Sequence, residues 1–188
     1  MAVSDASYRF SYVDNGAFGQ EGDSGVLSRC QFGKALENGV RSLNLPDVHF
    51  LNYDNTMCPY VFVVDDVFPL GERIIKPFGG VAASNRQRVF DYLLSRARRT
   101  INNAFGVMAS RFRVLCRPIG LEPRRVETIV KACVVLRDFL RQDDQELPEW
   151  KRYSASSMVD TELEDGSLRD AEWRAESRGT ATFREKMG

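Results

Sequence analysis

The residues of this chain that are best suited to chemistry are two adjacent carboxylates, Asp65 and Asp66. They follow a continuous apolar run, Tyr60 to Val64, whose pattern is typical of a strand buried on both faces of a sheet. Carboxylates after such a strand lie at the C-terminal edge of the sheet, where open α/β proteins build their sites. Asp65 is therefore a candidate ligand for a divalent cation, which prefers oxygen donors. A carboxylate that only caps the following turn is the alternative.

Asp14 and Asp23 are secondary candidates, because they flank a glycine-rich loop that follows another expected strand. Their carboxylates and that of Asp66 would approach Asp65 if the strands share one sheet edge. Turn formation at Asp14, and capping of a helix by Asp23 or Ser24, explain the same residues without any ligand.

Zinc chemistry and histidine-based catalysis have little support in the sequence. The chain has four cysteines, none of them in a C-x-x-C pair, and one histidine, His49. Zinc sites need clustered ligands, and a nucleophile with a histidine base would have to use His49, which has no suitable partner near it in sequence. We therefore predict that His49 is structural and that the cysteines are buried and reduced.

The formal net charge of zero hides two oppositely charged segments. Residues 86–125 contain ten arginines against two acids, a net charge of +8, and residues 143–172 contain ten acids against three bases, a net charge of −7. The planar guanidinium suits bidentate contacts to phosphate, so the basic segment is a candidate surface for a nucleic-acid backbone. A solvated helix face is the alternative. The candidate contacts are Arg96, Arg98, Arg99, Arg111 and Arg113.

Hydropathy and turn residues predict the elements that would position these side chains. Alternation predicts a hairpin from Met1–Ser4 and Tyr8–Val13, and helical spacing predicts one helix over residues 23–37 with Val26, Leu27 and Ala35 inward. A long helix is expected over residues 86–115, and Pro123 is suited to begin another. The expected inward residues of these two helices are Phe90, Leu93, Ala97, Ile101, Ala104, Met108, Val126, Cys133, Leu136 and Leu140.

The C-terminal part has a different composition. From Asp143 onward the chain is acidic, serine-rich and poor in aliphatic residues, which indicates a loosely ordered tail with one short helix near Leu168–Glu176. Trp150 and Trp173 lie in this tail, where they either anchor a partner or fold back onto the body.

Several segments carry a resemblance when they are read together and in order. They are Tyr8–Gly19, Glu21–Val26, Phe32–Leu36, Tyr60–Leu70, Asn85, Phe90–Arg99, Asn103–Gly106 and Arg111–Arg113. These segments resemble the DDE superfamily endonucleases derived from PIF/Harbinger-type transposases, over roughly residues 2–141. The resemblance implies an RNase H-like fold and metal-dependent cleavage of DNA phosphodiesters by three carboxylates and two metal ions.

Carried over residue by residue, the resemblance leaves one of the three acids intact. Asp65 matches the second acid and is the implied ligand for Mg²⁺ or Mn²⁺. The third acid, a glutamate before Asn-Ala-Phe-Gly, is replaced by Asn102, an amide that binds a hard cation weakly. The first acid belongs before Met1, which predicts an N-terminally truncated domain.

The resemblance implies an α/β protein with a partial RNase H-like fold, a mixed sheet flanked by helices over residues 1–141, and a mostly disordered acidic tail over residues 142–188. The expected function is that of a metal-dependent DNA endonuclease with impaired catalysis. The alternatives are a non-catalytic module that binds nucleic acid or protein, and a decayed remnant. DNA is the implied partner, with a protein partner that supplies DNA binding as a further possibility. We expect a nuclear or cytoplasmic location, and no apolar run approaches the roughly 18 residues of a membrane span.

Overall fold

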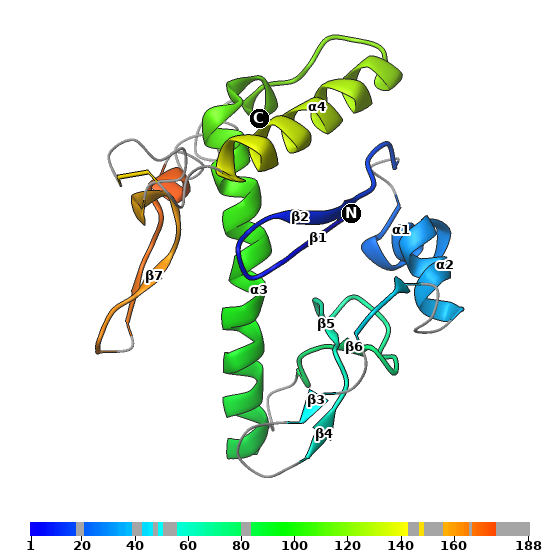
Figure 1. The fold of residues 1–188 in the computed structure, drawn as a ribbon, viewed down its shortest axis with the longest axis vertical. Coiled ribbons are helices and arrows are strands. Elements are labelled where there is room, and N and C mark those ends of the chain that lie inside the picture. The colour runs from blue at the N-terminus through cyan, green and yellow to red at the C-terminus, as the bar shows by residue number, and fades with distance from the viewer. Residues whose placement is uncertain are drawn as a thin grey trace, which may run out of the picture. The chain divides into compact units, whose positions relative to one another are not determined.

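A computed structural model of the chain contains two compact units (Figure 1). The first comprises residues 17–98 with Met1, and the second comprises residues 2–16 and 99–188. Helix α3 (Asn85–Arg111) begins in the first unit and ends in the second. Within the described residues, no helix is both long enough and apolar enough to cross a membrane. The structure describes residues 1–17, 21–38, 43–46, 49–50, 56–79, 84–142, 147–148, 156–165 and 167–175.

The first unit contains two short helices, four short strands and the first half of α3. Strands β3 and β4 pair antiparallel, and β5 and β6 pair parallel. Its elements are α1 (Asp23–Arg29), α2 (Gln31–Glu37), β3 (His49–Phe50), β4 (Met57–Cys58), β5 (Phe62–Val63) and β6 (Ile74–Ile75).

The second unit contains an N-terminal hairpin, the second half of α3, a second long helix and a C-terminal hairpin. Both hairpins are antiparallel. Its elements are β1 (Ala2–Ser4), β2 (Phe10–Val13), η2 (Arg113–Cys116), α4 (Pro123–Gln142), η5 (Ser156–Met158), β7 (Thr161–Glu162) and β8 (Leu168–Arg169).

The strands of the described residues form four separate two-stranded sheets. The class is mixed α/β, as predicted, but these residues do not show one mixed sheet flanked by helices. The prediction that the run Tyr60–Val64 is a strand buried on both faces is wrong. Of these residues, only Phe62 and Val63 are assigned to a strand. Tyr60 and Val61 are 44% and 37% exposed. β-branched residues favour extended backbone, whereas burial needs neighbours on both faces, and among the described strands this one pairs only with β6.

The single helix predicted over residues 23–37 is divided into two, α1 and α2, because Cys30 between them adopts an extended conformation. The Cys30 Sγ accepts a hydrogen bond from the Gly33 N–H at 3.2 Å and so caps α2. A Cβ built on Gly33 would lie 1.7 Å from the Leu27 carbonyl oxygen, so only glycine fits there. Helix α1 is capped by the Gly22 backbone, so capping by Asp23 or Ser24 is wrong. The predicted burial of Val26 and Leu27 is confirmed, while Ala35 is half-buried.

The N-terminal hairpin is confirmed, and α4 holds it in place within the second unit. The Phe10 N–H donates a hydrogen bond to Asp138 Oδ2 at 3.0 Å, and Asn15 Nδ2 donates to the Glu127 carbonyl at 3.0 Å. The Arg137 guanidinium stacks on the Phe10 ring, with its carbon 5.0 Å from the ring centroid. A cation over an aromatic face is an attractive contact, particularly where water is excluded.

Helices α3 and α4 are confirmed, and so is the predicted burial of Ala104, Met108 and Cys133. Other predicted inward residues are not buried. In α3, Leu93 and Ala97 are exposed, while Leu94 and Val107 are buried. In α4, Leu136 and Leu140 are 50% and 42% exposed, and Arg137 is fully buried. Where apolar residues are adjacent on a helix, its period does not decide which of them faces the core, so tertiary contacts make that choice.

The cysteine prediction holds for two of the four residues. All four thiols are free, and Cys30 and Cys133 are buried. Cys58 is half-buried, and Cys116, at the end of η2, is exposed. The side chain of His49 lies outside the described residues.

The C-terminal segment carries more regular structure than predicted. Residues 156–175 contain η5, the β7–β8 hairpin and one helical turn over 172–175. Leu168, expected in a helix, lies in β8. Trp173 folds back onto the body, because its ring packs directly on Gly106 of α3. Trp150 lies outside the described residues.

Substitution of Gly33 tests the close approach of α1 and α2. Gly33→Ala is expected to lower the free energy of unfolding by about 1–3 kcal/mol, because the new methyl group meets a backbone carbonyl that cannot rotate away. Urea unfolding followed by circular dichroism measures the change. The matched control is Gly25→Ala, where a Cβ meets no atom within 4 Å and helix propensity favours alanine by up to about 1 kcal/mol. Equal effects of the two substitutions would contradict the close approach.

Candidate functional site

Asp65 lies in the turn that follows β5, with its side chain 42% exposed. Its Oδ1 accepts a hydrogen bond from the Asp66 N–H at 2.8 Å, and its carbonyl accepts one from the Phe68 N–H at 3.2 Å. The turn-capping role that the sequence left open is therefore present. One carboxylate oxygen is thus already used by the backbone.

The second oxygen of Asp65 is paired with an arginine of α3. Asp65 Oδ2 accepts a short, charge-assisted hydrogen bond from Arg98 Nη2. The Arg98 side chain is 29% exposed, so the pair is only partly shielded from solvent. A cation that approached Asp65 would meet the positive charge of Arg98 at contact distance.

The other candidate acids do not complete a metal site around Asp65 in the structure. Asp23 is the exposed first residue of α1, and Asp66 is exposed, its carbonyl accepting from Lys76 Nζ at 3.1 Å. Asp14 follows β2 and belongs to the second unit. Among the described residues, no three His, Cys, Asp or Glu side chains come together as metal ligands. One ion-paired carboxylate does not fit the donor set of a two-metal centre.

Asn102 occupies an exposed position in the second half of α3. It lies one turn after Arg98, about 40° away around the helix, so both residues share one flank of α3. The next residue, Asn103, is only 2% exposed and was not singled out from the sequence. Its Oδ1 accepts a hydrogen bond from the Asp160 N–H at 3.2 Å. A buried amide in a helix signals a specific polar partner, but the sequence does not say which one.

The five candidate arginines do not share one face. Residues two apart on a helix point about 200° apart, so Arg96 and Arg98 lie on opposite sides of α3. Arg96 and Arg99 are about 60° apart and do share a face, on which the exposed Arg88 also lies. Arg111 is the last residue of α3, and Arg113, the first of η2, is exposed.

Arg99 has an acidic neighbour that the sequence did not indicate. Asp160, whose side chain is 4% exposed, accepts a bidentate hydrogen bond from Arg174, with Nε at 2.8 Å from Oδ1. This bond lowers the pKa of the Asp160 carboxyl below its ordinary value. Burial opposes the shift, while the Ala171 N–H, 3.0 Å from Oδ1, and the positive charges of Arg174 and Arg99 reinforce it.

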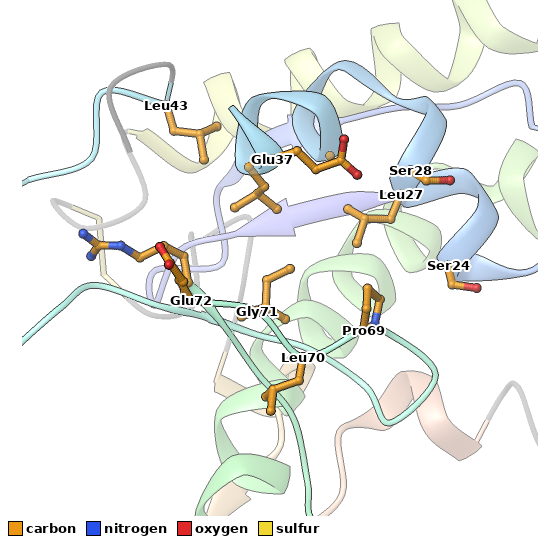
Figure 2. A pocket seen from close by; sticks show the side chains of 13 residues that line it. Ser24, Leu27, Ser28, Glu37, Leu43, Pro69, Leu70, Gly71 and Glu72 are labelled. Atoms are coloured by element: carbon orange, nitrogen blue, oxygen red, sulfur yellow. The ribbon is translucent and has the colours of Figure 1, made fainter. Parts of the chain in front are cut away.

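A pocket of about 390 Å³ lies in the first unit between α1, α2 and the loop before β6 (Figure 2). Leu27, Leu70 and Ile74 contribute apolar surface to it, and Ser24 and Glu72 lie along its rim. Asp65 is not among its lining residues. The pocket is therefore distinct from the candidate site.

These features define a mixed α/β protein with a carboxylate after a strand and an arginine-bearing helix beside it. A family model described as "DDE superfamily endonuclease" matches residues 1–138. The chain therefore belongs to the DDE superfamily endonucleases, which confirms the superfamily recognised in the sequence. Divalent metals are the general cofactors of this family. No curated protein and no solved structure matches the chain.

Removal of the Arg98 charge tests whether this charge weakens the binding of a cation by Asp65. Arg98→Gln is expected to raise the affinity for Mn²⁺ roughly tenfold, because a unit charge beside the carboxylate is removed and solvent screens only part of its effect. Titration followed by the electron paramagnetic resonance signal of free Mn²⁺ measures the change. Arg96→Gln is the control, since it removes the same charge from the opposite side of the helix. Equal affinity for Mn²⁺ in both variants would contradict the idea that Arg98 competes with the cation for Asp65.

Acidification tests the Asp160–Arg174 pair. Because the folded state lowers the Asp160 pKa, the ionised carboxylate stabilises the docked segment above the ordinary carboxyl value of about 3.9, and this stabilisation is lost as the pH falls through the lowered pKa. Tryptophan emission of Trp150→Phe, whose remaining tryptophan is Trp173, should shift to the red below pH ~4. Adding Asp160→Asn to the Trp150→Phe variant should abolish this pH-dependent shift of the Trp173 emission. A response that persists in the double variant would show that another group titrates.

Proposed function

We propose that this chain is a DNA-binding, nuclease-type domain derived from a Harbinger-type transposase, with impaired hydrolytic activity. Membership of the DDE superfamily endonucleases supports DNA as the partner and an RNase H-like ancestry of the fold. The observation that carries the proposal of impaired activity is the ion pair between Asp65 and Arg98. A nuclear location follows from the same proposal.

The Asp65–Arg98 pair favours binding of phosphate over binding of a cation. The guanidinium neutralises the one carboxylate that matches the family pattern, and no further acid of the described residues joins it. The guanidinium also has five N–H donors, of which one is used by Asp65, and planar donors suit phosphate oxygens. An arginine in this place lets Asp65 position a phosphate contact without holding a metal ion.

Asn102 points to the same function. The position that resembles the family's third acid carries an uncharged amide, and this amide is exposed on α3. An amide donates hydrogen bonds, so it can contact a phosphate that an aspartate or glutamate would repel. Loss of one negative charge on a DNA-facing helix strengthens attraction to the polyanion.

A protein-binding module is the second candidate function, and α4 favours it. Four apolar side chains share one helical face and are 42–66% exposed, which is unusual for a helix in a protein core. Such a module would take part in DNA transactions through a partner that supplies the DNA binding. The four residues are Val135, Leu136, Phe139 and Leu140.

Plasmid binding and nicking are measured in one experiment. With Mn²⁺ and supercoiled plasmid, the folded native chain should retard the plasmid on a gel without relaxing it, and Asp65→Ala should behave in the same way. Binding should weaken steeply between 50 and 200 mM salt, as expected for arginine contacts to the phosphate backbone. Circular dichroism confirms that both proteins are folded.

Two results would change this conclusion in different ways. Relaxation by the native chain that Asp65→Ala abolishes would disprove impaired catalysis and leave an active nuclease. A folded chain that neither retards nor relaxes the plasmid would disprove DNA binding, and the protein-binding module would then be the better account.

A further inference from the structure

Residues 156–175 are an acidic segment, and its described residues, 156–165 and 167–175, include ones that contact α3. They contain six acids and two arginines, a net charge of −4. They lie outside the region matched by the family model, which ends at residue 138. The segment and the second half of α3 belong to the same unit of the structure. Its contacts with this half of α3 are therefore contacts within one unit.

The first contact is polar and is organised by Asp160. The Asp160 N–H donates to Asn103 Oδ1, while its carboxylate accepts from the Ala171 N–H and from Arg174. Ala171 and Asn103 are each 2% exposed. A buried carboxylate with a bidentate arginine is a strong, directional contact, so it fixes the hairpin and the helical turn as one body on α3. The acid of this contact is also the one that lies near Arg99.

The second contact is steric and is made by Trp173. A Cβ built on Gly106 would lie 2.1 Å from the Trp173 ring, so the ring occupies the space that any other residue at this position would fill. Arg174 stacks on the outer side of the same ring, with its guanidinium carbon 4.5 Å from the centroid. The Trp173 Nε1–H is buried and has no acceptor among the described residues. Within the described residues, the indole is therefore held by shape, apolar contact and the stacked guanidinium of Arg174, and its release restores hydration of a polar group.

The covered face of α3 continues the row of arginines. Arg99, Asn103 and Gly106 lie within about 60° of one another around the helix, and the same face carries Arg96 one turn earlier. The segment therefore covers one end of the face on which Arg96 and Arg99 lie.

We propose that residues 156–165 and 167–175 form an acidic clasp that, when docked on α3 at Asn103 and Gly106, covers the face next to Arg99 and reduces the affinity of the chain for double-stranded DNA. The inference rests on the proposed DNA binding. DNA and the clasp compete for the same face, because both are anionic. Release of Trp173 from Gly106 opens this face.

Two variants release the clasp by different means in a Trp150→Phe background, where Trp173 is the only tryptophan. Gly106→Ala fills the space of the indole and adds no charge. Arg174→Gln breaks the bond to Asp160 and removes one positive charge, so charge alone would weaken DNA binding. Gly25→Ala, a helical glycine with open space around it, is the control.

Both releasing variants should shift the Trp173 emission to the red and bind a 30-base-pair duplex of arbitrary sequence about tenfold more tightly at fixed salt, as measured by fluorescence anisotropy. Added Arg99→Gln should remove this gain. Gly25→Ala should change neither reading.

Three results would overturn the clasp. A red shift with unchanged affinity shows that docking does not control DNA binding, and an unshifted emission in both variants shows that Trp173 is not docked on Gly106; both leave the proposed DNA binding intact. Absence of duplex binding by every form, in chains shown by circular dichroism to be folded, removes the clasp and the proposed DNA binding together.

Discussion

Helix α3 is the constraint on which the rest of the structure depends, because one unbroken helix of 27 residues carries the partners of three separate contacts. Arg98 pairs with Asp65, Asn103 accepts from the backbone of the C-terminal segment, and Gly106 admits an indole ring. A helix turns by about 100° per residue and rises 1.5 Å, so a shift of one position would move each group away from its partner. Each of these three contacts therefore depends on the register of α3.

The Asp65–Arg98 pair contributes little to the stability of the fold but strongly affects the chemistry of Asp65. Exposed ion pairs of this kind contribute about 0–1 kcal/mol, so the fold does not need it. Its effect is to change what Asp65 attracts, because a carboxylate alone draws cations and a carboxylate with a guanidinium presents donors to anions. Together with the amide at Asn102, the pair is the basis for our proposal that this DDE superfamily endonuclease holds a phosphate backbone without cleaving it.

The two charged segments of the chain have related roles. A net charge of zero is made from a segment of +8 and one of −7, and the structure brings part of the acidic segment to the basic helix. The clasp that we propose would screen the helix in cis while the protein stays neutral, through an acidic segment whose Asp160 is held by Arg174. Such screening acts over short distances only, since the Debye length at physiological salt is about 8 Å, and so it requires a docked segment and not merely a nearby one.

The sequence alone determined the features that depend on neighbouring residues. The hairpin, the start of α4 at Pro123, the long helix and the position of Asp65 after a strand all follow from alternation, helical period, proline geometry and turn chemistry, which act over a few residues. The superfamily could also be recognised from the sequence, because its motifs are short and local. Only the tertiary structure decided which sides are buried, that Arg137 and not Leu136 faces the hairpin, that Asp65 is paired with Arg98, and that Trp173 lies on Gly106. These outcomes depend on side chains tens of residues apart in the chain, and no local pattern contains the identity of a distant partner.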